Sequence, residues 1–329
     1  MKPFSLNLAL AGLLLLFSGL SLFCGNAALD LASLTGLFGQ DPGLDTLILQ
    51  EIRLPRLALG LLVGAGLGGA GAVLQGFLRN PLADPGVVGV SASAGFGAVL
   101  ALYFGLSGLF ALALPLAGVI GAASGVALLF LIAGPRASAT TLILSGVAVN
   151  ALAGALTALM MNLSPNPWAL AEIAYWLMGS LKDASWNEVG FAVPLILSGL
   201  AILLFCAPAL DALSLGEDAA RSLGIDLSRL RLAVVAGTAL AVGGGVAVAG
   251  AIGFVGLVVP HILRPLTGYR PGALVLPSML GGALLVVLAD MAIRLLSGPG
   301  LPLYLGVLTA LIGAPFFLWL VRASQKVAP

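Results

Sequence analysis

The residue types that most often carry chemistry are rare in this sequence, and their spacing favours no catalytic or metal centre. His261 is the single histidine, and neither a His-Glu-x-x-His nor a Cys-x-x-Cys pattern occurs. The two cysteines, Cys24 and Cys206, lie far apart in apolar segments, so a disulfide framework is not expected. We interpret His261, which follows Pro260, as a structural residue; ligation of haem or a metal is the minority alternative. No cofactor is therefore expected.

The lysines exclude a nucleotide-binding motif. None of Lys2, Lys182 and Lys326 follows a glycine and precedes Ser or Thr, as the lysine of a P-loop does. Any ATP hydrolysis that the function requires must then come from another chain, and this chain itself is not expected to be an enzyme. A membrane-embedded enzyme would need a catalytic cluster inside its apolar segments, and the sequence shows none.

One acid stands in an apolar run. Asp290 precedes Arg294 by one helical turn. Ionisable residues inside a membrane are costly and usually functional. Two interpretations stay open: an ion pair between neighbouring turns near one helix end, and the coupling acid of a secondary carrier that runs without ATP. A proton-driven carrier would normally need more buried acids, which favours the ion pair.

The elements that position these residues must be membrane helices. Hydrophobic residues make up 60% of the 329 positions and charged residues 8%, whereas soluble proteins carry roughly a quarter charged residues. The formal net charge of +1 gives no reason to expect nucleic acid. A spanning helix needs about 20 mainly apolar residues. We expect an all-α integral membrane protein with about ten spans: 5–24, 57–78, 87–106, 109–133, 139–162, 189–207, 231–251, 253–266, 273–296 and 303–321.

The chain ends and the long connections follow from these spans. Segment 5–24 follows Lys2 and has two interpretations, a cleaved signal peptide and a retained first helix; its length favours the retained helix. Ten spans place both termini on one side, and the excess of Lys and Arg in the loops of that side predicts that it is cytoplasmic. Two outer stretches, 25–56 and 163–188, are long. The second holds tryptophans that are expected to anchor the chain at the interface, with substrate contact as the alternative: Trp168, Trp176 and Trp186.

Segment 211–230 is the most polar stretch on the cytoplasmic side. We expect a short helix capped by Ser214, with Glu217 three residues later, and ended by Gly224. The residues alone leave two interpretations equally open: an ordinary amphipathic connector, and a docking helix for a cytosolic partner.

Several stretches together resemble the FecCD family, the permeases that import cobalamin, haem and ferric siderophores. They follow one another in the family's order from about residue 50 to 320, and as a set they are specific. They are Arg53-Leu-Pro-Arg56, Gly71-Ala-Val-Leu-Gln-Gly76, Arg79-Asn-Pro-Leu-Ala-Asp-Pro-Gly86, Gly89-Val-Ser91, Leu144-Ser-Gly-Val-Ala148, segment 214–224, Gly250-Ala-Ile-Gly-Phe-Val-Gly-Leu-Val-Val-Pro-His261, Leu288-Ala-Asp290 and Gly313-Ala-Pro-Phe316.

The resemblance implies a type II ABC importer permease-like bundle, with residues 1–329 as one transmembrane permease domain. It implies a homodimer around a central translocation path in the bacterial plasma (inner) membrane. Two cytosolic ATP-binding subunits and a periplasmic or extracellular substrate-binding protein are the expected partners. The cargo would be a metal chelate, and an iron complex is favoured only because that group of permeases is the larger one.

The resemblance also assigns site residues. The residues expected to contact the ATPase are Leu215, Gly216, Glu217, Ala220, Arg221, Leu223 and Gly224. Docking of the binding protein falls on Arg53, Arg56 and Arg294, with lipid-headgroup anchoring as the alternative. A cytoplasmic gate falls on Asn80, Leu82, Ser138 and Ala139, with a plain Pro-rich turn as the alternative for the first two.

Two positions depart from the family pattern. Ala139 stands where the family often has a larger polar residue, and this weakens its assignment to the gate. The run Gly300-Leu-Pro-Leu-Tyr-Leu-Gly306 lacks the acid that often precedes the last span and adds Tyr304. Since Tyr304 is expected near the outer mouth, this change is predicted to alter docking or substrate preference.

Overall fold

The computed structural model describes residues 3–25, 43–110, 112–134, 137–164, 167–297 and 303–325. Within these residues seven helical segments are long and apolar enough to cross a membrane, and three further apolar helices are shorter. Each of these segments overlaps one of the predicted spans. The long ones are α1 (Pro3–Phe23), α4 (Leu54–Phe77) with its helical extension, α6 (Ala113–Ala133), α7 (Ala139–Asn162), α9 (Trp186–Leu213), α11 (Leu227–Thr238) with its continuation, and α14 (Pro271–Leu296).

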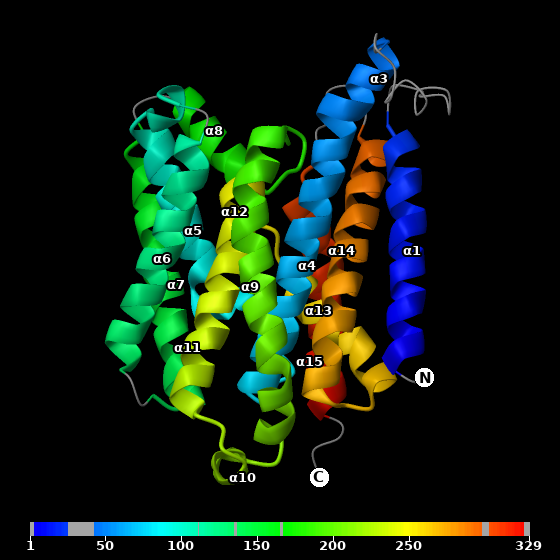
Figure 1. Cartoon of the computed structure of the whole chain (residues 1–329). Helices are drawn as coiled ribbons and strands as arrows, with labels where there is room; N and C mark the ends of the chain where they lie inside the picture. Colours follow the sequence, from blue (N-terminus) through cyan, green and yellow to red (C-terminus); the bar gives the residue numbers. More distant parts are fainter. Residues whose placement is uncertain are drawn as a thin grey trace.

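The helices form one bundle with two distinct ends (Figure 1). The short helix α10 (Glu217–Ser222) lies at one end, and the start of α1 and the end of α15 (Leu305–Gln325) lie at the same end. Helices α3 (Leu44–Ile48) and α8 (Pro167–Leu177) lie at the opposite end. We call these the α10 end and the α8 end.

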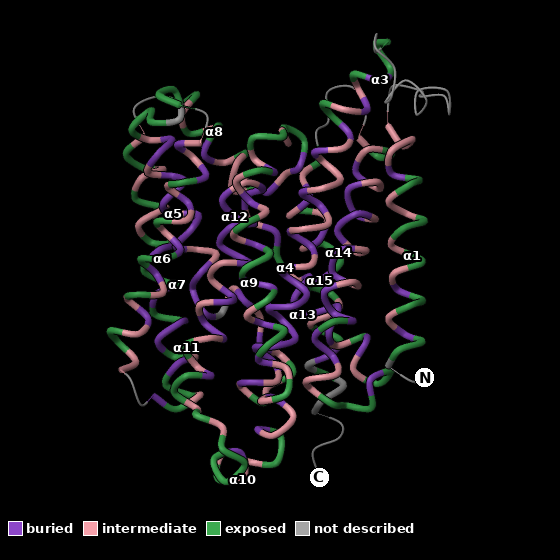
Figure 2. Tube along the Cα trace, viewed as in Figure 1, coloured by how far each residue is buried: buried purple, intermediate pink, exposed green. Residues whose placement is uncertain are grey.

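Glycines bring α4 against α14 at backbone contact. A Cβ atom at Gly68 would lie 2.0 Å from the Ser278 carbonyl oxygen of α14. One turn later, a Cβ atom at Gly71 would lie 1.9 Å from the Gly256 oxygen of α13 (Val255–Leu263). Membrane helices gain van der Waals contact where small residues let their backbones approach. Helix α4 is accordingly among the most buried parts of the bundle (Figure 2).

A second group packs in the same way. A Cβ atom at Gly97 of α5 (Val90–Tyr103) would lie 2.2 Å from the Ala117 oxygen of α6, and one at Gly121 of α6 would lie 2.2 Å from the Ser93 oxygen. Helix α7 lies alongside this pair (Figure 1). The turn η2 (Pro85–Val88), which leads into α5, also packs on α7.

The chain between α11 and α14 is broken twice. The π-helical turn η4 (Ala239–Gly243) joins α11 to α12 (Gly244–Ala249), and residues 250–254 then leave the helix before α13 begins. The Ala249 oxygen at this break accepts a hydrogen bond of 2.8 Å from the Ser180 amide. Backbone groups in lipid need such partners, and Gly250 and Ile252 of the break are buried. The short turn η5 (Arg264–Thr267) ends α13.

Two connections differ from the sequence-based expectation. The end of the predicted outer stretch 25–56 is helical, because α3 and the π-turn η1 (Leu49–Arg53) run without interruption into α4; residues 26–42 lie outside the described residues. The predicted stretch 163–188 contains α8, a helix of 11 residues that the sequence analysis missed. A further short turn, η3 (Leu106–Gly108), follows α5.

Candidate functional site: coupling, docking and gating residues

Helix α10 projects from the α10 end of the bundle between α9 and α11 (Figure 1). Its Ala220 is fully buried, whereas Leu215 and Leu223 on either side of the helix are 70% and 64% exposed. Arg221 forms ion pairs with Glu217 at 3.1 Å and with Asp218 at 3.0 Å. The predicted helix in segment 211–230 is therefore present, and it offers two exposed leucines and a charged turn outside the bundle.

The start of α10 differs from the prediction, and its end agrees with it. The predicted cap by Ser214 is wrong, because its hydroxyl donates to the Asp211 oxygen at 2.6 Å and α10 begins after Gly216. Gly216 has φ +111°, a conformation that side chains with a Cβ rarely adopt, and this directs the chain away from α9. The predicted stop at Gly224 is confirmed. Its φ is +85°, and the amides of Gly224 and Ile225 bond to the oxygens of Arg221 and Ala220.

Asp211 ties the segment leading to α10 to the start of α14. Its Oδ1 accepts a hydrogen bond of 2.8 Å from the Gly272 amide, and its Oδ2 pairs with Arg270 at 2.9 Å. A carboxylate at the first turn of a helix satisfies a free amide and interacts well with the helix dipole. This clamp joins residues 61 positions apart, and the sequence analysis did not find it.

We expect Asp211→Ala to lower the free energy of unfolding by about 1–2 kcal/mol, because α14 loses its capping oxygen. Asp211→Asn keeps an oxygen for the Gly272 amide and should cost less, since the Arg270 pair is partly exposed and such pairs contribute little. Thermal unfolding of the purified variants in one detergent measures both. Equal losses for the two variants would assign the effect to the ion pair instead of the cap.

The gate candidates lie in two turns at the α10 end. In the turn after α4, the Asn80 side-chain oxygen accepts a hydrogen bond of 2.9 Å from the Leu82 amide. Ser138 caps α7 by accepting one of 3.1 Å from the Thr141 amide, and Ala139 is the first residue of that helix. Leu78, at the end of α4, lines a small apolar cavity together with Leu142 of α7. The fold thus brings the two turns to neighbouring positions.

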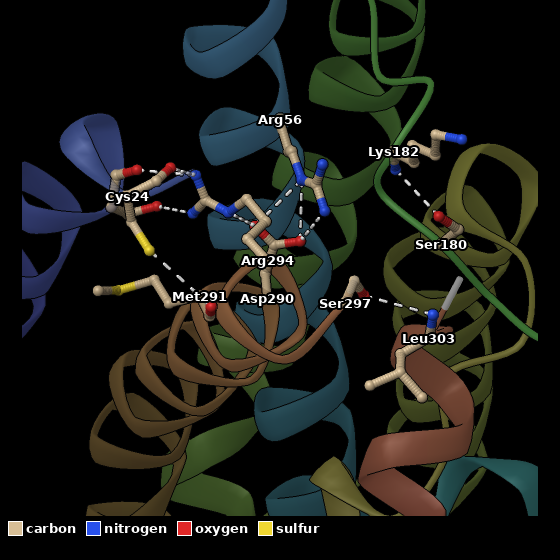
Figure 3. A network of polar contacts seen from close by, with 10 residues as sticks. Cys24, Arg56, Ser180, Lys182, Asp290, Met291, Arg294, Ser297 and Leu303 are labelled. Atoms are coloured by element: carbon tan, nitrogen blue, oxygen red, sulfur yellow. Dashed lines mark hydrogen bonds and ion pairs between the residues drawn. The ribbon is translucent and has the colours of Figure 1, made fainter. Parts of the chain in front are cut away.

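Arg56, Asp290 and Arg294 form a largely buried cluster near the α8 end (Figure 3). Asp290 pairs with Arg56 at 2.8 Å and with Arg294 at 3.1 Å; the side chains of Asp290, Arg294 and Arg56 are only 6%, 11% and 14% exposed. Arg56 reaches both carboxylate oxygens, with three hydrogen bonds of 2.8–3.1 Å. The predicted pair between Asp290 and Arg294 is confirmed, and Arg56 is a partner that the sequence analysis missed.

Arg294 and Arg53 hold the end of α1. Arg294 donates to the oxygens of Ser21 and Cys24, at 2.8 Å in each case, and also to the Ser21 hydroxyl. Arg53, which is buried, donates to the Leu22 oxygen. Cationic groups at the last carbonyls of a helix are stabilising. Arg53, Arg56 and Arg294 therefore direct their guanidinium groups to partners within the chain, and their predicted docking of a binding protein stays a prediction.

A further polar contact lies where α4 meets α13. Arg264 donates to the Gln75 side-chain oxygen, and the Gln75 amide donates to the Gly256 oxygen at 3.2 Å. His261 stands one turn before Arg264 with its ring edge-on to Phe316, the ring centroids being 5.6 Å apart. Its Nδ1 is buried and has no hydrogen-bond partner among the described residues. His261 therefore makes the contacts of a side chain that is packed between helices.

The fold and these contacts define a multi-pass helical membrane protein with one polar helix projecting from one end. The sequence profile of the FecCD transport family matches residues 13–323, and the chain belongs to that family. It is 39% identical over 328 residues to the Fe(3+)-citrate import system permease protein YfmE of Bacillus subtilis (strain 168), covering 99% of this chain and 97% of that one.

Other relatives have different named cargoes. The chain is 40% identical over 280 residues to the cobalamin import system permease protein BtuC of Halobacterium salinarum (84% of this chain, 74% of that one). It is 37% identical over 280 residues to the hemin transport system permease protein HmuU of Yersinia pestis (84% and 83%). A solved inward-facing structure, assigned to the metal-chelate type of ABC transporter, superposes with a TM-score of 0.86 at 35% identity, covering 97% of this chain and 99% of that one.

Proposed function

We propose that this chain is the permease subunit of an ATP-driven importer that moves a metal chelate across the bacterial plasma membrane. The observation that carries the proposal is family membership over residues 13–323, combined with the close likeness to a metal-chelate type ABC transporter. The importer would contain two copies of the chain, two cytosolic ATP-binding subunits and an external binding protein. The whole chain would act as a single permease domain, with the chelate moving between the two copies.

The α10 end is assigned to the cytoplasm in this proposal, with both termini there. Helix α10 would insert into a groove of the ATP-binding subunit, and Leu215 and Leu223 would fill apolar positions on either side. The ion pairs of Arg221 with Glu217 and Asp218 stiffen the exposed turn. A stiff helix transmits displacement, and the Asp211 clamp would pass that displacement to α14.

The α8 end is assigned to docking of the binding protein. The cluster of Arg53, Arg56 and Arg294 would take part in two ways. First, it would fix the relative positions of α1, α4 and α14. Second, a glutamate of the binding protein would pair with these guanidinium groups by displacing Asp290 or the carbonyls at the end of α1. The turns at Asn80–Leu82 and Ser138–Ala139 would close the path at the α10 end, and movement of the two packed helix groups would open it.

The test of this assembly is the paired change Glu217→Ala and Arg221→Ala. We expect uptake of chelate to fall about tenfold or more when the variant is reconstituted with its ATPase, because the docking turn loses its charges and its stiffness. Arg322→Ala, an exposed arginine near the end of α15 on the same side, is the matched control and should leave uptake unchanged. Unchanged uptake together with unchanged ATPase assembly would refute the role of α10.

The competing function is a secondary carrier that uses Asp290 to couple transport to an ion. Asp290 is held in ion pairs by Arg56 and Arg294 within a largely buried cluster, which is the arrangement of a structural contact between helices. Purification of the native complex distinguishes the two functions. A stoichiometric ATP-hydrolysing partner supports the importer, whereas uphill transport by the chain alone supports the carrier.

A further inference from the structure

A cavity of about 630 Å³ lies at the α8 end, and its lining residues Ser180 and Lys182 stand near the arginine cluster (Figure 3). This volume falls in the range of binding sites for small molecules. One face of α8 forms its wall, with Trp168, Glu172 and Tyr175 at successive turns. The start of α9, residues 180–184, the end of α12 and Tyr304 complete it. We call this cavity the α8 chamber.

Aromatic rings form much of the wall of the α8 chamber. The rings of Tyr175 and Tyr304 are stacked, with centroids 5.8 Å apart and planes 9° apart. Trp168 and Trp176 also line it, and Trp168 is 85% exposed. Flat aromatic faces bind apolar ligand surface, and they attract cations through the negative charge of their faces. Tyr304 is the residue added at the departure from the family pattern, and the structure places it in this wall.

The charges around the chamber are predominantly negative. Glu172, Asp183 and Glu188 line it, and Lys182 is the one cation among its lining residues. Glu188 is used locally, since its carboxylate accepts a hydrogen bond of 2.9 Å from the Ser185 amide in a capping box. Lys182 and Asp183 are both exposed. With one cation against three acids, the lining side chains carry more negative than positive formal charge.

The end of one helix adds to this negative charge. The last residues of α12, Ala247 to Ala249, form part of the wall, and the C-terminal end of a helix carries a partial negative charge. The acids, the α12 end and the aromatic faces favour a cation, whereas the first turns of α8 and α9 carry the opposite partial charge.

We infer that the α8 chamber is a ligand subsite that selects chelates with a net positive charge, or with a pendant ammonium group, over anionic chelates. This inference rests on the proposed function, because the chamber lies at the end where an importer receives its cargo. The ammonium or other cationic group would lie between Glu172 and Asp183 and against the stacked tyrosines. An anionic chelate such as a polycarboxylate complex would be repelled by the same acids.

The test uses the full chain in nanodiscs of zwitterionic phosphatidylcholine, without its partners. The probes are three forms of one ferric trihydroxamate with a linear ligand: the free terminal amine (net +1), its N-acetyl derivative (net 0) and its N-succinyl derivative (net −1). Equilibrium dialysis with radiolabelled iron gives each affinity. We expect the +1 complex to bind about tenfold more tightly than the −1 complex, and added salt to reduce the difference. Equal affinities, preference for the anion or no binding of any form would overturn the inference.

Substitutions test whether the acids of the chamber cause the preference for the +1 complex. Glu172→Gln combined with Asp183→Asn should bring the affinities of the +1 and −1 complexes close together. Glu51→Gln removes an exposed acid at the same end that does not line the chamber, and it should leave the preference intact. A preference that survives the double change would overturn the inference. Because no ATPase is present, this outcome is independent of the co-purification and uptake experiments that test the importer itself.

Discussion

Replacing Asp290 with alanine will lower the free energy of unfolding by about 3–5 kcal/mol, because two buried arginines lose their shared counter-charge. Arg56 and Arg294 are 14% and 11% exposed, and neither can turn toward water without moving its helix. Arg294 would keep its bonds to the end of α1, but these carbonyls carry only partial charges. Thermal unfolding and the amount of folded protein recovered from membranes measure the loss.

Two comparisons isolate the cause of this loss. Glu51→Gln removes an exposed acid at the same end and should leave stability unchanged. Asp290→Leu combined with Arg56→Met and Arg294→Met removes the acid together with both of its ion-pair partners and should be more stable than Asp290→Ala, since neither of these two arginines is then left without a counter-charge. If Asp290→Ala unfolds at the wild-type temperature but abolishes transport, the carboxylate serves the transport cycle instead of the structure, as a secondary carrier requires.

Gly68→Ala should also destabilise the bundle, by about 3 kcal/mol. The added methyl group would lie 2.0 Å from the Ser278 oxygen and 3.1 Å from the Gly282 Cα, and both atoms belong to the α14 backbone. No rotation of a side chain relieves this contact, so α4 and α14 must separate along their whole interface. Size-exclusion chromatography after heating gives the midpoint of unfolding for each variant.

A graded series of glycine changes serves as the control. A methyl group at Gly60 of α4 would meet the flexible end of Leu181 at 3.3 Å, so Gly60→Ala should cost much less than Gly68→Ala. Gly190 of α9 has nothing within 4 Å of the added atom, and Gly190→Ala should be neutral or slightly stabilising through its helix propensity. Equal effects at Gly68 and Gly60 would contradict the assignment of backbone contact as the cause.

The sequence by itself determined those features that depend on short-range signals. Apolar runs of about 20 residues located the seven helices that are long enough to span and the three shorter apolar helices among the described residues, since the hydrocarbon thickness fixes how long such a run must be. The stop of α10 at Gly224 and the pairing of Asp290 with Arg294 were also predictable, because a C-terminal glycine and a spacing of four residues act within one or two helical turns. The ordered set of family motifs indicated the class of transporter.

Only the tertiary structure decided which distant residues meet. Arg56 pairs with Asp290 across 234 positions, and Asp211 caps α14 across 61, and neither residue type specifies its partner. Helix α8 has only 11 residues, too few for a span, and the α8 chamber combines residues of several distant segments, so a search for apolar runs of about 20 residues gave no signal for either. The physical reason is that hydropathy, capping and helical spacing are local quantities, whereas ion pairs and cavities between helices depend on which faces pack together.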